Sequence, residues 1–254
     1  MRVKSVVVAA SGVLALSALA VPAAHADVKT GDADITSVVV NGGEPVVVGT
    51  TDRTVTVNVT ATDPSGFWQI NATLYHGSVN SPDGSVRSTA ACRPTTATTS
   101  TCTLTFNLKP GTALTDDALA GTWNVTANAL ANDGDTVFLD NAATFTMQRD
   151  TQVTAEAAPE TVKWGKSLTV TGGVQHASWA TGAYAGAEAG QPVELQFRPE
   201  DCEEYFTVKT VPTAADGTVS TTVRAYLDGS YRWSYAATAG TAAAVSADDF
   251  VDVR

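Results

Sequence analysis

The chain has 254 residues, of which 15 are lysine or arginine and 26 are aspartate or glutamate, so its formal charge is −11. This acidic balance argues against a nucleic-acid partner, which requires a basic patch, and against binding to an anionic membrane surface. Charged residues make up 16% and hydrophobic residues 44%. This composition excludes a charge-rich disordered chain and leaves a globular protein of one or two domains.

The first segment, 1–26, has the three parts of a secretory signal peptide. Arg2 and Lys4 supply the positive start, an apolar run covers 6–20, and alanines at the −3 and −1 positions suit cleavage after Ala26. A short membrane anchor is the alternative, but serine and glycine interrupt the run and a proline ends it. We therefore predict a secreted, extracellular protein that inserts into no membrane after cleavage. Loss of two cations leaves 15 − 2 = 13 basic and 26 acidic residues, a charge of −13.

Beyond the leader, apolar and polar residues alternate as they do in strands with one buried face, and helix-length amphipathic stretches are missing. The alternating positions of the first half are Val55, Val57, Val59, Trp68, Ile70, Ala72, Leu74, Cys102, Leu104, Phe106, Leu108, Trp123, Val125, Ala127 and Ala129. Those of the second half are Leu168, Val170, Val193, Leu195, Phe197, Val219, Thr221 and Val223. Short β-branched strands separated by Asp-Gly turns predict an all-β sandwich fold. The phase of the alternation places Trp68, Trp123 and Trp233 in cores.

The three cysteines have different predicted roles. Cys92 and Cys102 are ten positions apart, and we predict that they form a disulfide because export places them in an oxidising compartment. Two buried thiols are the alternative. A loop of this length gives a disulfide that contributes about 3 kcal/mol of stability. Cys202 is then left over among four acidic residues, which favours an inert or adventitiously dimerising thiol over a nucleophile.

A Leu-x-Gly-x-aromatic motif occurs once in each half, at 119–123 and at 227–231. It resembles the tyrosine corner of immunoglobulin-like folds, whose hydroxyl bonds to nearby backbone. Two positions later, where an antibody domain has its second cysteine, stand Val125 and Trp233, which predicts cores closed by packing. Trp123 has no hydroxyl, so we expect the first corner to lack its hydrogen bond.

The two motif copies are 108 residues apart, about the length of one sandwich domain. We therefore predict two tandem immunoglobulin-like β-sandwich domains, 27–149 and 150–254, after the cleaved leader 1–26.

The second half resembles the C-terminal immunoglobulin-like domain of secreted actinomycete proteins. The matching segments are GKSLTVTG at 165–172, QPVELQFR at 191–198, TVKTV at 207–211 and DVR at 252–254. The first half resembles a companion domain of unknown function from the same organisms, through VVVNGG at 38–43, LYHG at 74–77 and the cysteine pair. The resemblance implies export, an actinomycete source and this architecture. It implies no activity or catalytic motif, although some such proteins are named calcium-binding.

Catalytic motifs are missing from the sequence. The mature chain has two histidines, His76 and His176, and neither has a partner at the spacing of an imidazole metal site. Serine-hydrolase elbows, zinc-protease helices and phosphate-binding loops are also missing. We therefore predict a protein that is not an enzyme.

Calcium binding is the more specific alternative function. Asp133, Asp135 and Asp140 fall within eight residues, and Asp63 begins a turn at another strand end. Calcium takes six to eight oxygen ligands, which clustered carboxylates and loop carbonyls supply. The spacing is not that of an EF-hand, and a plain Asp-Gly turn on an acidic surface is the other interpretation.

Carbohydrate binding is the third hypothesis. Sugar sites use exposed aromatic rings, and Trp179 and Tyr184 lie in a stretch without strand alternation, so we predict a loop with both residues exposed as ligand contacts. The sequence thus indicates a secreted, non-enzymatic, monomeric binding or structural module. Its expected partner is an extracellular protein or a cell-envelope component, without a required cofactor unless calcium binds.

Overall fold

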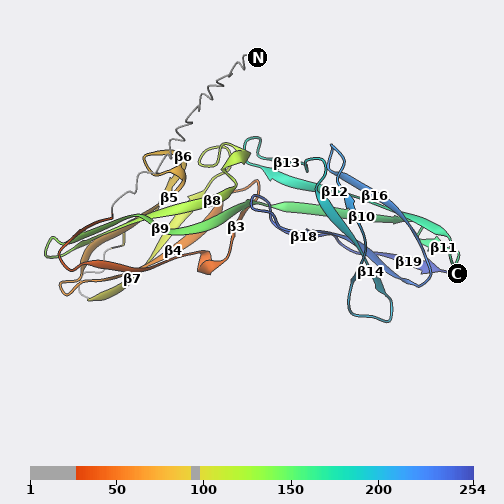
Figure 1. The fold of residues 1–254 in the computed structure, drawn as a ribbon, viewed down its shortest axis with the longest axis horizontal. Helices are drawn as coiled ribbons and strands as arrows, with labels where there is room; N and C mark the ends of the chain where they lie inside the picture. Colours follow the sequence, from red (N-terminus) through yellow and green to blue (C-terminus); the bar gives the residue numbers. More distant parts are fainter. Residues whose placement is uncertain (1–26, 93–97) are drawn as a thin grey trace, which may run out of the picture.

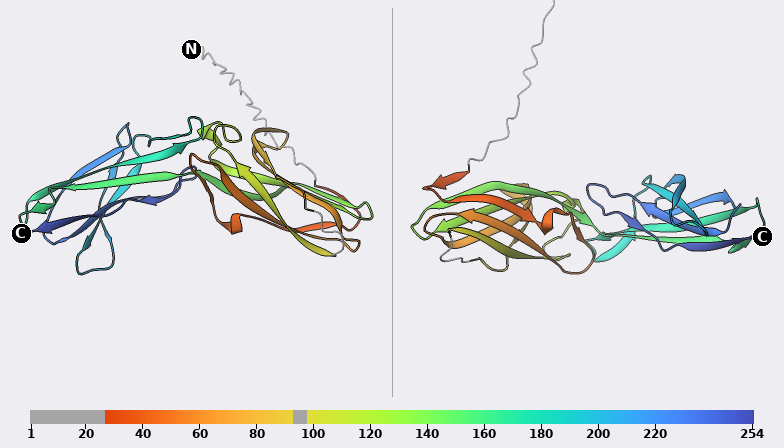
Figure 2. Two further views of the ribbon diagram at one scale, coloured as in Figure 1. Left: turned by 180° about the vertical axis from the view of Figure 1, so that it is seen from behind. Right: turned by 90° about the horizontal axis from the view of Figure 1, so that it is seen from below.

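The computed structural model describes residues 27–92 and 98–254, so the predicted signal peptide, 1–26, lies outside the described residues. Two β-sandwiches lie end to end (Figures 1 and 2). Between the strands, the described residues form the short 3-10 helices η1 (Asn41–Gly43) and η2 (Asp117–Leu119). Within this part of the chain, no helix has the length and apolar character needed to cross a bilayer.

The first sandwich packs two sheets face to face. Its strands are β1 (Val28–Thr30), β2 (Asp34–Val40), β3 (Val46–Val48), β4 (Arg53–Thr62), β5 (Phe67–Ser78), β6 (Ser81–Arg87), β7 (Thr99–Leu108), β8 (Gly121–Ala131) and β9 (Thr136–Arg149). One sheet has the order β2-β4-β7, and the other has the order β1-β9-β8-β5-β6 with β3 paired to β9. Strand β3 runs parallel to β9, whereas the other pairs are antiparallel.

The second sandwich repeats this plan. Its strands are β10 (Thr151–Ala158), β11 (Thr161–Val162), β12 (Ser167–Ser178), β13 (Ala183–Gly186), β14 (Pro192–Pro199), β15 (Phe206–Pro212), β16 (Thr218–Arg224), β17 (Gly229–Tyr235), β18 (Ala244–Val245) and β19 (Asp249–Val253). Strands β10, β12 and β16 form one sheet with β13, and the other sheet has the order β11-β19-β17-β14-β15 with β18 paired to β17. Strand β11 is parallel to β19.

Both sandwiches therefore have the strand order of an immunoglobulin-like fold. In each of them, an early strand pairs in parallel with the last strand of the sandwich, and the strand that follows the early one belongs to the opposite sheet. The fold class expected from the alternation is confirmed: the chain is all-β, with two tandem immunoglobulin-like sandwiches.

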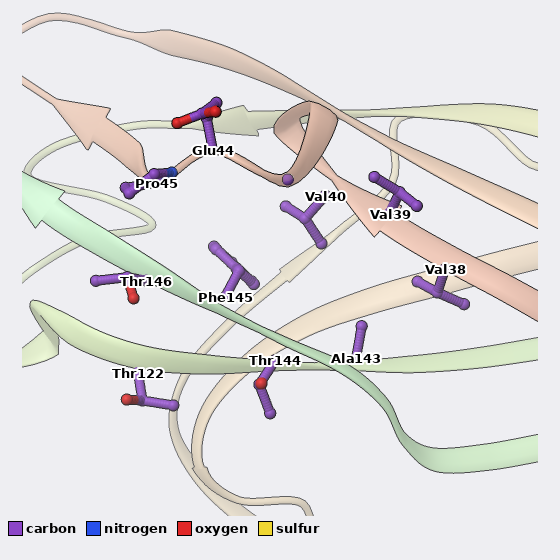
Figure 3. A pocket seen from close by; sticks show the side chains of 11 residues that line it. Val38, Val39, Val40, Glu44, Pro45, Thr122, Ala143, Thr144, Phe145 and Thr146 are labelled. Atoms are coloured by element: carbon purple, nitrogen blue, oxygen red, sulfur yellow. The ribbon is translucent and has the colours of Figure 1, made fainter.

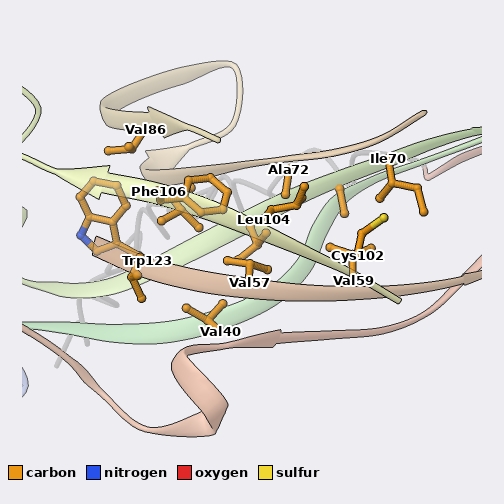
Figure 4. Close-up of a cluster of buried hydrophobic side chains, with 14 of the residues drawn as sticks. Val40, Val57, Val59, Ile70, Ala72, Val86, Cys102, Leu104, Phe106 and Trp123 are labelled. Atoms are coloured by element: carbon orange, nitrogen blue, oxygen red, sulfur yellow. The ribbon is translucent and has the colours of Figure 1, made fainter. Parts of the chain in front are cut away.

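The core of the first sandwich follows directly from the period-2 pattern. Val55, Val57 and Val59 on β4 are buried, while the threonines and asparagine between them face solvent. Leu104 and Phe106 on β7 meet this row from the same sheet, and β5 and β8 close the core from the other sheet (Figure 4). Burial of such side chains contributes about 1.5 to 3 kcal/mol each, which offsets the entropy lost on folding.

The predicted disulfide is present. Cys102 lies on β7, and Cys92 follows β6 and forms an isolated bridge with Ile70 on β5. The bond therefore links the two sheets of the first sandwich at one edge. Cys202 is a free, exposed cysteine.

Trp68 is not in the core, which corrects the prediction made from its phase. The side chain is 47% exposed, and Phe67 is buried in its place. The register of β5 against β8 shifts between Phe67 and Gln69, which marks a bulge. A bulge adds one residue to a strand and turns the next side chain to the opposite face.

The corner motif of the first sandwich also differs from expectation. Trp123 donates its indole N–H to the carbonyl of Leu119 at 2.6 Å, so the backbone hydrogen bond of the corner is made without a hydroxyl. Val125 and Trp233 are both fully buried, as expected for cores closed by packing.

Candidate functional site

Four aspartates from distant parts of the sequence meet at the end of the first sandwich. Asp32 lies between β1 and β2, Asp63 follows β4, and Asp133 and Asp135 lie in the turn between β8 and β9. One carboxylate oxygen from each of the four lies within 4.8 Å of the others. We call this group the aspartate cluster.

Asp63 is the buried member of the aspartate cluster. Its residue is 1% exposed, and its Oδ1 accepts hydrogen bonds from the backbone N–H of Ser65 at 2.7 Å and from the Ser65 hydroxyl at 2.6 Å. Its other oxygen, Oδ2, is buried and has no hydrogen-bond partner. A buried carboxylate oxygen without a partner is costly, because it has lost its water and gained nothing in return.

Hydrogen bonds within the loops hold the other carboxylates in place. Asp135 Oδ2 accepts the backbone N–H of Asp32 at 2.9 Å, and Asp133 Oδ1 accepts the N–H of Asp135 at 3.1 Å. Gly31 adopts a φ of 69°, and a Cβ at this position would overlap the Asp135 carboxylate. Only glycine therefore allows the β1–β2 turn to approach the β8–β9 turn so closely.

The aspartate cluster concentrates negative charge. The pKa of Asp32 is raised above its ordinary value, first by partial removal from water and then by the charges of the three other carboxylates. Within the described residues, no lysine or arginine forms an ion pair with any of the four. A hollow of about 420 Å³, lined in part by Asp32 and Asp63, opens beside the cluster.

The structure brings together only part of the calcium set predicted from the sequence. Asp133 and Asp135 are in the aspartate cluster, but Asp140 lies five residues farther along β9, where its backbone carbonyl accepts the hydroxyl of Tyr75 at 2.9 Å. Asp32 was not among the predicted residues. The sequence carries one indication of it, a glycine before an aspartate between two short β-branched runs, but only the pairing of β1 with β9 brings it to the site.

Trp179 is not the exposed ligand contact that the sequence suggested. Its side chain is fully buried in the core of the first sandwich, although it follows β12 of the second. The indole N–H donates to the carbonyl of Val48 at 3.1 Å, and the backbone N–H of Trp179 donates to Asp117 at 2.6 Å. Trp179 therefore joins the two sandwiches. It lies outside the strands, as predicted, but the prediction that it is exposed was wrong.

Tyr184 lies beside this contact between the two sandwiches, which we call the joint. It is half-buried on β13, which corrects the prediction of an exposed loop residue. Its hydroxyl donates to Asp150 Oδ2 at 2.6 Å, and burial followed by this carboxylate raises the pKa of the phenol to about 12. An open cleft of about 460 Å³, lined in part by Arg53, Asp150 and Tyr184, adjoins the ring. Its role as a ligand contact stays a prediction.

A charged network completes the joint. The Arg149 side chain, 13% exposed, pairs with Asp117 at 3.4 Å and with Glu188 at 3.3 Å. His176 is 2% exposed, and its Nδ1 lies 3.0 Å from the hydroxyl of Thr151 while its Nε2 has no partner. Burial lowers the pKa of His176 and the Arg149 charge lowers it further, against an opposing effect of Glu188.

This environment predicts a loss of stability in mild acid. The unfolded histidine takes up a proton near its ordinary pKa of about 6.5, whereas the folded state resists protonation. The unfolded state therefore binds more protons in this window, so the free energy of unfolding falls as the pH falls from about 7 to 5.5. Thermal melts across this range should show a shallower pH dependence for His176→Gln than for the unchanged protein. Equal slopes would remove His176 as the cause.

The open edge of the first sandwich holds a groove without catalytic groups. It has a volume of about 470 Å³ between β2 and β9, with Val38 and Val40 facing Ala143 and Phe145 (Figure 3). Of the residues that line it, only Glu44 has an ionisable side chain, so the groove contains no acid–base pair.

The fold defines this chain as a protein of two tandem immunoglobulin-like sandwiches. No family model and no curated protein matches it. Among solved structures, it is similar to fibronectin(III)-like modules of Clostridium thermocellum CbhA, at 15% identity over 85% of this chain and 95% of that one, with a TM-score of 0.31. The D00-D0 domain of intimin gives 16% identity over 85% and 99%, with a TM-score of 0.28. A superoxide reductase from Ignicoccus hospitalis gives 20% over 41% and 82%, with a TM-score of 0.30. These values are too low to say anything about function, so the fold assignment comes from the strand order.

Proposed function

We propose that this chain is a secreted, non-enzymatic binding or structural module whose first sandwich binds one calcium ion in the aspartate cluster. The observation that carries the proposal is the buried Oδ2 of Asp63, which has no protein partner and belongs to a group of four converging carboxylates. A cation at this position supplies the missing partner and offsets the mutual repulsion of the four charges.

Calcium fits the donor set better than the smaller magnesium ion. Calcium accepts six to eight oxygens in flexible geometry, whereas magnesium requires a near-ideal octahedron and retains several waters. The four carboxylates come from three separate turns and are all hard oxygen donors. Extracellular modules bind calcium with dissociation constants of about 10⁻⁴ to 10⁻³ M, a range that suits a partly exposed site.

The role of the ion follows from where its ligands lie. Asp32, Asp63 and Asp135 belong to the β1–β2, β4–β5 and β8–β9 turns, so one ion would hold all three turns together. The protein would then act as a monomeric module in which these turns of the first sandwich are held rigidly together only when calcium is bound. Its partner would be an extracellular protein or a component of the cell envelope.

Calcium is expected to stabilise the first sandwich. A free concentration one hundred times the dissociation constant adds about 2.7 kcal/mol, which raises the melting temperature by on the order of 10 °C. A thermal melting series in calcium and in EDTA measures this shift, and Asp63→Asn and Asp133→Asn should abolish most of it.

Asp140→Asn is the matched control, because it removes the same charge from the same strand region outside the aspartate cluster. It should keep the full calcium shift. A flat melting series for the unchanged protein, or an equal loss in Asp140→Asn, would contradict the proposal.

A further inference from the structure

The far end of the second sandwich carries a cluster of large exposed apolar side chains. Trp164 is 67% exposed, Tyr226 is 49% exposed and Leu227 is 58% exposed. They lie in the β11–β12 and β16–β17 turns, next to the C-terminus and at the end opposite the joint (Figure 1). We call these three residues the distal tip. Solvent-exposed apolar side chains grouped in this way mark a binding surface more often than chance placement does.

Backbone hydrogen bonds fix the distal tip. The N–H of Trp164 donates to the carbonyl of Arg254 at 2.8 Å, and the N–H of Gly165 donates to the carbonyl of Ala225 at 2.7 Å. The ring centroids of Trp164 and Tyr226 lie 5.3 Å apart in an edge-to-face arrangement. The rings are therefore held in position before any ligand arrives, which lowers the entropy cost of binding.

Two lysines flank the exposed indole of Trp164 on an otherwise acidic protein. Lys163 and Lys166 flank Trp164 in the four-residue turn, are exposed, and form no ion pair with the described residues. The guanidinium of Arg224 donates to the carbonyl of Gly165 at 3.0 Å, in the same turn. Residues 27–254 carry a charge of −13 as a whole, so the three basic residues of this region form a local attraction for an anion on an acidic chain.

The exposed area of the distal tip and its charge indicate which kind of ligand it binds. The three side chains expose on the order of 300 Å², whereas a stable protein–protein interface requires about 800 Å² from each partner. The distal tip is therefore too small to form a stable interface with a second copy of the chain. An occupant with negative charge is favoured because Lys163 and Lys166, which flank Trp164, form no ion pair with the described residues. A sugar ring is the size of one indole, and its C–H face packs on an aromatic face.

We propose that the distal tip binds an acidic polysaccharide. A sugar ring stacks on Trp164, Tyr226 supports the indole from its edge, and the carboxylates of the polymer pair with Lys163 and Lys166. This site is independent of calcium and lies on the other sandwich from the aspartate cluster.

The test uses polygalacturonate, a uronic acid polymer, with neutral dextran as the comparison probe and EDTA present throughout. EDTA excludes calcium bridging, so the result is distinct from any outcome of the calcium proposal. The unchanged protein should bind polygalacturonate and not dextran. Trp164→Ala should weaken binding by about tenfold, the size expected for one lost ring contact. The double variant Lys163→Gln with Lys166→Gln should weaken it and reduce its salt dependence.

Trp68→Ala is the matched control, because Trp68 is an exposed tryptophan on the other sandwich. It should bind like the unchanged protein. Melting temperatures of both tryptophan variants verify that they fold, which is expected because neither ring is in a core. The proposal is overturned by absent polygalacturonate binding, by equal binding of Trp164→Ala, or by a dimer in sedimentation that Trp164→Ala abolishes.

Discussion

Trp179→Ala is expected to lower the free energy of unfolding of the first sandwich by about 3 to 5 kcal/mol, although the residue belongs to the second. The indole is fully buried in the first core, so its removal leaves a large cavity and takes away one of the two hydrogen bonds that the Val48 carbonyl accepts. Urea denaturation measures the loss, and native-state hydrogen exchange assigns it to the strands that contact the ring.

The same variant should uncouple the two sandwiches. The indole and its hydrogen bond to Val48 are the contacts that the variant removes between the sandwiches, whereas the backbone N–H of residue 179 can still donate to Asp117. Small-angle scattering should show a wider range of angles between the sandwiches in Trp179→Ala. The control, Trp68→Ala, should change stability by less than about 1 kcal/mol because its ring is half exposed. A Trp179→Ala protein as stable as the control would refute the role of this joint.

Trp233→Ala is expected to cost the second sandwich about 3 to 5 kcal/mol. The ring is fully buried on β17 and reaches across the core, where its indole N–H donates to the carbonyl of Thr171 on β12 at 3.0 Å. Gly172 makes room for it, since a Cβ at that position would lie 2.7 Å from Trp233 Cδ1. The indole thus spans the two sheets where an antibody domain has its disulfide.

Trp233→Phe separates packing from the hydrogen bond. The phenyl ring keeps much of the buried surface but loses the hydrogen bond to the Thr171 carbonyl, at a cost of about 0.5 to 1.5 kcal/mol. Urea midpoints of the second sandwich should therefore rank the unchanged protein above Trp233→Phe, and Trp233→Phe above Trp233→Ala. Trp164→Ala removes an exposed ring from the same sandwich and should leave the midpoint nearly unchanged. Equal midpoints for the two alanine variants would contradict this account.

Local alternation was sufficient to predict the strands and most of the core. The row of Val55, Val57 and Val59 is buried as expected, because successive side chains of a strand point to opposite faces. A strand with one solvated face therefore has alternating apolar and polar residues. Trp68 shows where this reasoning fails, since one extra residue in a bulge reverses the face and alternation carries no mark of it.

Contacts between distant segments could not be predicted in this way. Trp179 lies in a stretch without alternation, and its burial depends on the core of the other sandwich. Asp32 reaches the aspartate cluster through the pairing of β1 with β9, more than one hundred residues later in the chain. The grouping of Asp133 with Asp135 was predictable because both occupy one turn.

The parallel pairing of β11 with β19 gives the second sandwich a mechanical property. The backbone N–H groups of Asp252, Arg254 and Trp164 donate to the carbonyls of Glu160, Val162 and Arg254, respectively, at 2.8 to 2.9 Å. A pull on the chain at the two ends of this sandwich acts along both strands, so it loads these bonds in shear and together instead of one after another. A module anchored through its distal tip would therefore resist tension most strongly at the turn that contains Trp164.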